Sequence, residues 1–155
     1  MNAAALQRLA DRIELEDLVI RYANAIDRRD FDALDAVFLP DAHIDYRAMG
    51  GIQGDYPTVK AWLPQALGSF PAYMHLIGNV EFQIDGDTAH GRVACFNPMQ
   101  VPDPNGGEGE TMFLGLWYLD EYRRTVDGWR IARRAEQRCY LHNMPAWMKR
   151  ALKLV

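Results

Sequence analysis

The chain contains only two cysteines, Cys95 and Cys139, and they belong to neither a CxxC pair nor a cysteine–histidine cluster. Two isolated cysteines cannot form the disulfide framework of a small secreted domain, and they lack the spacing of a zinc site. We therefore expect two reduced thiols and no metal.

The N-terminal segment, MNAAALQRLADRIELEDL, lacks a continuous apolar run and carries charges throughout. It therefore matches neither a signal peptide nor a membrane-spanning helix. The net charge of −4 argues against nucleic acid or an anionic membrane as a partner. We expect a cytoplasmic protein that binds a small molecule or another protein.

The sequence also lacks the motifs GxGxxG, GxSxG and HExxH, and it has no P-loop. Nucleotide binding, serine hydrolysis and zinc proteolysis therefore have no motif support. Any catalytic site in this chain is expected to work without a cofactor.

The length of 155 residues and the apolar content of 49% suit one globular domain that spans residues 1–155. Apolar residues at helical spacing predict a helix over residues 3–25. A second helix is predicted over 30–38, ended by Pro40, and a third over 59–68, capped by Thr58.

The pattern changes to alternating runs after Pro71. Strands are predicted over 43–47, 74–85, 88–101, 111–125 and 129–142. Turn residues at 85–87 and 126–128 join the last four strands into two hairpins. Helices followed by a meandering antiparallel sheet indicate an α+β fold.

Asp27 and His75 are the first candidates for chemistry. Asp27 lies on or beside the apolar stripe of the first helix, where a carboxylate is costly to bury, and His75 alternates into a long strand. Each residue also has a structural interpretation: Asp27 as a solvated helix end or a cap, and His75 as a satisfied core histidine. Likewise, Tyr22 and Tyr46 are either site residues or core aromatics whose hydroxyls reach the surface.

With these residues placed, the chain resembles the SnoaL-like group of the NTF2-like superfamily. The resemblance lies in LEDLVIRYANAIDRRDFDALDAVF, IDYR, MHLIGNV, IDGDTA and YLDEYRRTVDGWRIARR. It implies N-terminal helices packed on a curved, mixed and largely antiparallel sheet, which together form a cone-shaped barrel around one pocket. It also implies a homodimer or a homotrimer.

Within that group the pattern is most similar to scytalone dehydratase, the bile acid dehydratases and hexachlorocyclohexane dehydrochlorinase. Their catalytic aspartate and histidine correspond to Asp27 and to His75, which follows 48 residues later. Their pocket tyrosines correspond to Tyr46 and Tyr22, and their arginine on the last strand corresponds to Arg138 or Arg134.

The chain departs from those enzymes at four positions of the implied pocket. Ile26 replaces a tyrosine, Met99 a histidine, Tyr118 an asparagine and Asn97 an acid, and we assign all four to substrate binding. Trp62 and Trp117 join an expected apolar lining that also includes Phe38, Leu63, Phe70, Phe113 and Leu116.

The resemblance implies a cofactor-independent, dehydratase-like lyase that acts on a hydrophobic cyclic or polycyclic molecule, such as a steroid or a polyketide. In that reaction His75 is the base, held by Asp27, and the tyrosines and an arginine stabilise the oxyanion. Two alternatives stay open: an isomerase or cyclase with the same groups, and a non-catalytic domain for ligand binding or subunit assembly.

Overall fold

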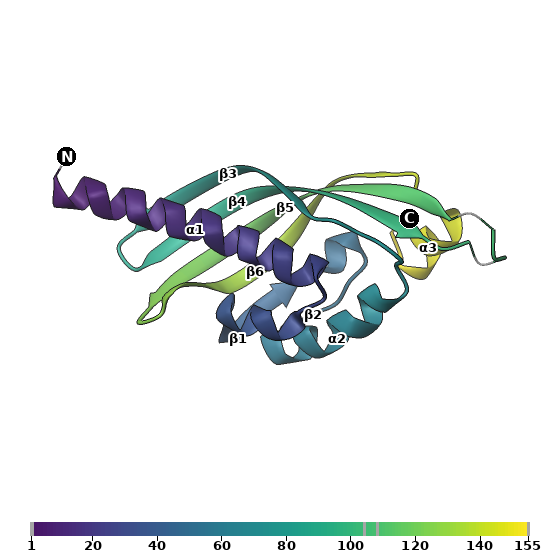
Figure 1. The fold of residues 1–155 in the computed structure, drawn as a ribbon, viewed down its shortest axis with the longest axis horizontal. Helices are drawn as coiled ribbons and strands as arrows, with labels where there is room; N and C mark the ends of the chain where they lie inside the picture. The colour runs from purple at the N-terminus through teal and green to yellow at the C-terminus, as the bar shows by residue number, and fades with distance from the viewer. Residues whose placement is uncertain (1, 104, 108, 155) are drawn as a thin grey trace.

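The computed structural model describes residues 2–103, 105–107 and 109–154. Its first element, α1 (Ala3–Asp27), is a long helix that lies across one face of the sheet (Figure 1). The side chain of Asn2 caps this helix, because its Oδ1 accepts a hydrogen bond of 2.9 Å from the backbone amide of Ala5. The buried side of α1 carries Leu15, Leu18, Val19, Tyr22 and Ile26.

The sheet has six strands in the order β2-β1-β6-β5-β4-β3. Within the described ranges β1 and β6 are the one parallel pair, and the other neighbours are antiparallel. Among the described residues β2 and β3 stay at the two edges, so the curved sheet is open and its helices complete the enclosure. The predicted α+β architecture is confirmed. The strands are β1 (Phe38–Asp45), β2 (Gln53–Asp55), β3 (Leu76–Asp85), β4 (Thr88–Val101), β5 (Glu110–Thr125) and β6 (Gly128–His142).

Both predicted hairpins are present, and each turns at a glycine with positive φ. Asp85 pairs with Thr88 across a turn that contains Gly86, at a φ of 58°. Thr125 pairs with Gly128, whose φ is 97°. Glycine adopts this left-handed conformation without the steric penalty of a Cβ atom.

The prediction of a helix over 30–38 was wrong at its end. A short 3₁₀ helix, η1 (Phe31–Ala36), forms there and is capped by Asp30. The chain then leaves the helix because Phe38 starts β1, which pairs with β6, and Pro40 lies inside that strand. Pairing with β6 therefore overrides the local helical pattern.

The third helix begins earlier than predicted, as α2 (Tyr56–Gly68). Asp55 is its cap, not Thr58, since the Asp55 carboxylate accepts the backbone amide of Thr58 at 2.9 Å. Pro64 lies inside α2. Two further short helices, η2 (Arg47–Met49) and α3 (Ala146–Ala151), follow β1 and β6.

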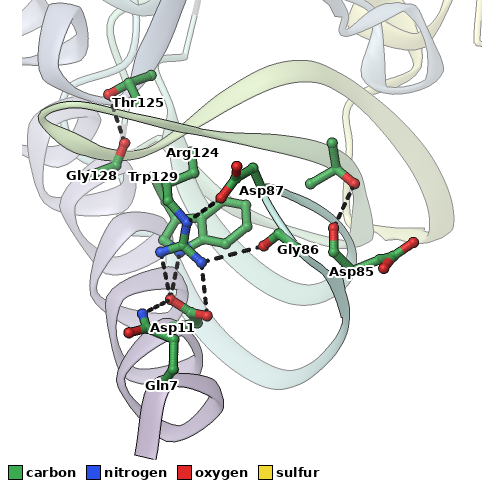
Figure 2. Close-up of polar contacts among 10 residues, drawn as sticks. Gln7, Asp11, Asp85, Gly86, Asp87, Arg124, Thr125, Gly128 and Trp129 are labelled. Carbon is green, nitrogen blue, oxygen red and sulfur yellow. Dashed lines mark hydrogen bonds and ion pairs between the residues drawn. The ribbon is translucent and has the colours of Figure 1, made fainter. Parts of the chain in front are cut away.

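An ion-pair cluster fastens the first half of α1 to the hairpin tips (Figure 2). Arg124 donates two hydrogen bonds to the buried carboxylate of Asp11, at 2.7 and 2.9 Å, and a third to Asp87 at 2.8 Å. The indole of Trp129 donates to the same Asp11 carboxylate at 3.3 Å. This cluster holds α1 at Asp11 against β5, β6 and the β3–β4 turn, and so helps to set the direction of the helix toward its C-terminal end.

Candidate active site

A cavity of about 660 Å³ lies between the core of the domain and a cover formed by α2, α3 and the loop around η2. Most of its wall is apolar, and five methionines contribute to it. Its polar wall residues include Tyr22, Tyr46, His75, Asn97 and Glu136. The methionines are Met49, Met99, Met112, Met144 and Met148.

Asp27 and His75 meet beside this cavity. The ring Nδ1 of His75 lies 2.7 Å from Oδ1 of Asp27. The backbone amide of His75 donates to the same carboxylate, at 3.1 Å to Oδ1 and 2.9 Å to Oδ2. The His75 side chain is 9% exposed and that of Asp27 is 23% exposed, so the pair is largely withdrawn from solvent.

The chain around the pair is held by contacts to the end of α1. His75 lies one residue before β3, not inside a strand as predicted. The hydroxyl of Tyr73 donates to the carbonyl of Ile26 at 3.0 Å, and the guanidinium of Arg29 donates to the carbonyl of Phe70 at 2.6 Å. The first bond satisfies a backbone carbonyl in the last turn of α1. Together the two bonds hold residues 70–75 against the C-terminal end of α1 and the residues that follow it.

The geometry of the pair sets the protonation pattern of the imidazole. An ionised carboxylate only accepts hydrogen bonds, so Nδ1 of His75 carries the hydrogen that faces Asp27. The other ring nitrogen, Nε2, then has a free lone pair in the neutral ring. A histidine arranged in this way can take a proton from a molecule in the cavity, while Asp27 stabilises the imidazolium that results.

Tyr22 and Tyr46 form a second polar pair in the cavity wall. Their hydroxyl oxygens are 2.9 Å apart, although the residues come from α1 and from the end of β1. Burial raises the pKa of both phenols, and that of Tyr46 lies well above its ordinary value. Both groups are therefore neutral. One hydroxyl donates to the other, and the accepting hydroxyl keeps its own proton for a molecule in the cavity.

The two arginines assigned from the sequence do not reach the cavity wall. Arg134 is fully buried, donates to Asp120 at 2.8 and 2.6 Å, and lies 4.0 Å from the ring centroids of both Tyr22 and Tyr118. Arg138 is exposed, with its Nη1 3.5 Å from the carbonyl oxygen of Leu154. Arg134 thus packs against the tyrosine rings from outside the cavity, and Arg138 does not line the cavity.

The other residues assigned to the pocket lie partly in the cavity wall and partly outside it. Ile26, Trp62, Asn97, Met99 and Tyr118 line the cavity, and so do the expected Leu63 and Phe70. Trp117 does not line it, because it alternates with Leu116 and Tyr118 and stacks under Arg92 on the opposite face, 3.6 Å from its guanidinium carbon. Phe38, Phe113 and Leu116 are also outside the cavity wall.

The sequence interpretation missed Glu136 and most of the methionines. Glu136 shares its strand face with Arg134, two residues earlier, so the alternation of β6 carried a usable signal. A charged residue in an amphipathic strand is more often solvated, however, and this hid it. Three residues of α3 also line the cavity: Trp147, Met148 and Ala151.

Two classes of feature are absent from the part of the chain that the structure describes. No three His, Cys, Asp or Glu side chains there gather closely enough to hold a metal ion. None of the helices described is both long enough and apolar enough to cross a membrane.

Comparisons with known proteins agree with this architecture. The uncharacterized protein Rv2910c of Mycobacterium tuberculosis is 52% identical over 136 residues, which cover 88% of this chain and 90% of that protein. Hexachlorocyclohexane dehydrochlorinase LinA-type3 from Novosphingobium barchaimii superposes with a TM-score of 0.75 at 19% identity, covering 91% of this chain and 99% of that one. A scytalone dehydratase-like protein from Novosphingobium aromaticivorans gives a TM-score of 0.77 at 16% identity, covering 90% and 91%.

The two structural likenesses are too distant in sequence to show more than a shared fold. The family model described as a SnoaL-like domain matches residues 7–135, which include most of α1, the Asp27–His75 pair and most of the sheet. This chain therefore belongs to the SnoaL-like family and has an NTF2-like fold.

Proposed function

We propose that this protein is a cofactor-independent lyase that eliminates water from a hydrophobic cyclic or polycyclic compound. The observation that carries the proposal is the Asp27–His75 pair, joined at 2.7 Å beside a cavity that His75 lines. A buried histidine that is held by a carboxylate and faces a cavity is arranged for general base catalysis.

The proposed reaction moves one proton and breaks one carbon–oxygen bond. Nε2 of His75 takes a proton from a carbon next to a carbonyl group of the substrate. One hydroxyl of the Tyr22–Tyr46 pair donates to the enolate oxygen, while the other hydroxyl donates to the first and strengthens it as a donor. When the enolate collapses, the hydroxyl group on the neighbouring carbon leaves and takes the proton from the His75 imidazolium, so that water is the second product.

The cavity wall supports an apolar substrate. Side chains such as Ile26, Trp62 and Phe70 offer apolar surface with few polar groups among them. The five methionines add flexible, polarisable side chains that adapt to rings of different shape. A cavity of about 660 Å³ has room for a molecule of three or four fused rings.

The named structural neighbours support an elimination. One is named as a dehydrochlorinase and another as scytalone dehydratase-like, and both names describe loss of a small molecule from a ring compound. Since their identity to this chain is 16% and 19%, they favour this class of reaction without identifying the substrate.

The test uses 3-hydroxy-1-tetralone, a β-hydroxy ketone whose dehydration gives fluorescent 1-naphthol. Wild-type protein should accelerate naphthol formation, and His75→Gln should lower the rate by about 10²- to 10⁴-fold. His90→Gln, a change to an exposed histidine on β4, is the matched control and should keep the wild-type rate.

A second measurement separates the alternatives. Exchange of the C2 protons of 1-tetralone in D₂O, followed by NMR, reports proton abstraction without elimination. Exchange that depends on His75, without naphthol formation, would indicate an isomerase or cyclase. Tetralone binding without exchange and without naphthol would indicate a non-catalytic binding domain and would overturn the proposal.

A further inference from the structure

Glu136 is a buried acid that the proposed reaction does not use. It forms part of the cavity wall, on the same face of β6 as Arg134. Its residue surface is only partly buried because it borders the cavity, yet its Oε2 atom is shielded from solvent and has no hydrogen-bond partner. A shielded carboxyl oxygen without a partner costs far more free energy when the group is charged than when it is neutral, so this site favours the neutral acid. The part of Glu136 that borders the cavity is open to a ligand.

The surroundings of Glu136 favour its neutral form. Burial raises the pKa of the Glu136 carboxyl well above its ordinary value, and the negative charge of Asp45 raises it further. The positive charge of Arg134 and the backbone amide of Met49 oppose this shift. Arg134 offsets it only in part, because two of its nitrogens already bind the carboxylate of Asp120.

Glu136 and His75 both line the cavity, and they come from parts of the chain that lie apart in the sheet. β5 and β4 separate the strand of Glu136 from β3, which His75 precedes, so three strand spacings of about 4.8 Å divide the two backbones before curvature shortens the distance. The ring of Tyr22 lies between, with its centroid 6.4 Å from that of His75. Glu136 is also close enough to Tyr22 and Tyr46 for its charge to raise their pKa values.

We propose that Glu136, as a neutral carboxylic acid, donates a hydrogen bond to an acceptor oxygen that the ligand carries at the end away from His75. The ligand class is therefore a fused-ring compound with a carbonyl or ether oxygen remote from its reacting carbon. A rotation about χ3, which is a soft torsion in glutamate, is enough to turn the donor toward the cavity. The inference rests on the proposed function only in placing the reacting carbon at His75.

Glu136 is in this view a specificity residue, so its test is a binding measurement. The probes are 9-fluorenone and fluorene, which share three fused rings and differ by the ketone oxygen. Their affinities are measured by quenching of tryptophan fluorescence, since Trp62 and Trp147 line the cavity. Wild-type protein should prefer fluorenone, and Glu136→Leu should reduce that preference by about tenfold, as expected for the loss of one hydrogen bond.

Two further variants keep the result interpretable. Glu136→Gln keeps a neutral donor and should retain the preference for fluorenone. His75→Gln should also retain it, whether or not the protein proves to be a lyase, because binding is measured without turnover. Failure of the proposed function and failure of this inference are therefore distinguishable.

Infrared difference spectroscopy provides the direct readout and does not depend on how Glu136→Leu folds. The wild type should show a carboxylic acid band that is absent from Glu136→Gln, and the carbonyl band of bound fluorenone should shift to lower frequency. A fluorenone preference that is the same in wild type and Glu136→Leu, or the absence of a Glu136-dependent carboxylic acid band, would overturn the inference.

Discussion

The carboxylate of Asp27 binds His75 at two places, the backbone amide and the ring Nδ1. The same side chain therefore positions the main chain of His75 and orients its imidazole. Asp27 is the last residue of α1, where the helix dipole disfavours a negative charge. Two donors from one residue offset that cost and couple the end of the helix to the loop that carries the histidine.

Asp27→Asn should abolish the function of the pair while the fold persists. An amide can accept from the His75 backbone but no longer stabilises an imidazolium, so we expect proton exchange from 1-tetralone to slow by at least about 100-fold. Asp41→Asn, at an exposed position on β1, is the control and should exchange at the wild-type rate. A comparable loss in both variants would contradict the specific role of Asp27.

Tyr46→Phe and Tyr22→Phe should each lower kcat for naphthol formation by about 10-fold, because either change removes the donor to the enolate oxygen or the hydroxyl that supports it. The double variant should lose less than the product of the two effects, since each single change already breaks the hydrogen bond of 2.9 Å between the hydroxyls. Steady-state kinetics of the three variants checks this. Strictly multiplicative effects would mean that the two hydroxyls act independently.

Gly51→Ala should impair the site although residue 51 takes no part in the proposed reaction. A Cβ atom at this position would lie 2.6 Å from Cβ of Tyr46 and 3.0 Å from the indole of Trp62, so one of them must shift. We expect naphthol formation to slow and the melting temperature to fall by a few degrees. Gly68→Ala, where a Cβ meets no neighbour within 4 Å, is the control.

Asp11 should make stability dependent on acid pH. Its hydrogen bonds from Arg124 hold the pKa of this carboxyl below the ordinary value of 3.8, despite the opposing effect of burial. The ionised Asp11 therefore stabilises the folded state at pH values above the unfolded pKa of 3.8. This stabilisation is lost as the pH falls through the lower pKa of the folded state. Asp11→Asn should cost about 1–3 kcal/mol of unfolding free energy near pH 7, and the cost should shrink toward pH 2.

Urea denaturation of wild type and Asp11→Asn at several pH values measures this difference. Glu16→Gln is the control on the same helix, since the Glu16 ion pair with Arg12 is exposed and should contribute less than about 1 kcal/mol. A pH-independent difference between wild type and Asp11→Asn would show that the carboxylate charge is unimportant.

Glu136 should make the folded state less stable as the pH rises, which is opposite to the effect of Asp11. Because burial holds its pKa above the ordinary value of 4.5, the folded state keeps a proton that the unfolded state loses as pH rises. Stability should therefore fall between that value and the raised folded pKa, by up to about 1.4 kcal/mol per pH unit. Glu136→Gln should remove this slope in urea denaturation, and an unchanged slope would mean that Glu136 is ionised when folded.

Local sequence determined the hairpins and marked Asp27 as a candidate. Alternating runs joined by glycine turns such as Gly86 specify antiparallel pairing, because neighbouring residues make those contacts. An acid beside an apolar helical stripe drew attention to Asp27, although periodicity alone fitted a solvated helix end equally well. The expectation that Asp27 and His75 meet came from the family resemblance, since nothing local joins residues 48 positions apart.

Only the tertiary structure decided which residues of β6 face the cavity. Arg134, Glu136 and Arg138 follow one alternation, yet the first is buried against Asp120, the second lines the cavity and the third is exposed. The register of β5 and β6 shifts beside Arg138, opposite Gly115, and such a bulge changes the course of a strand. The alternation of residues along a strand predicts which face of the sheet each side chain lies on. The curvature of the sheet, its bulges and the helices packed on it decide whether that side chain contacts the core, the cavity or solvent.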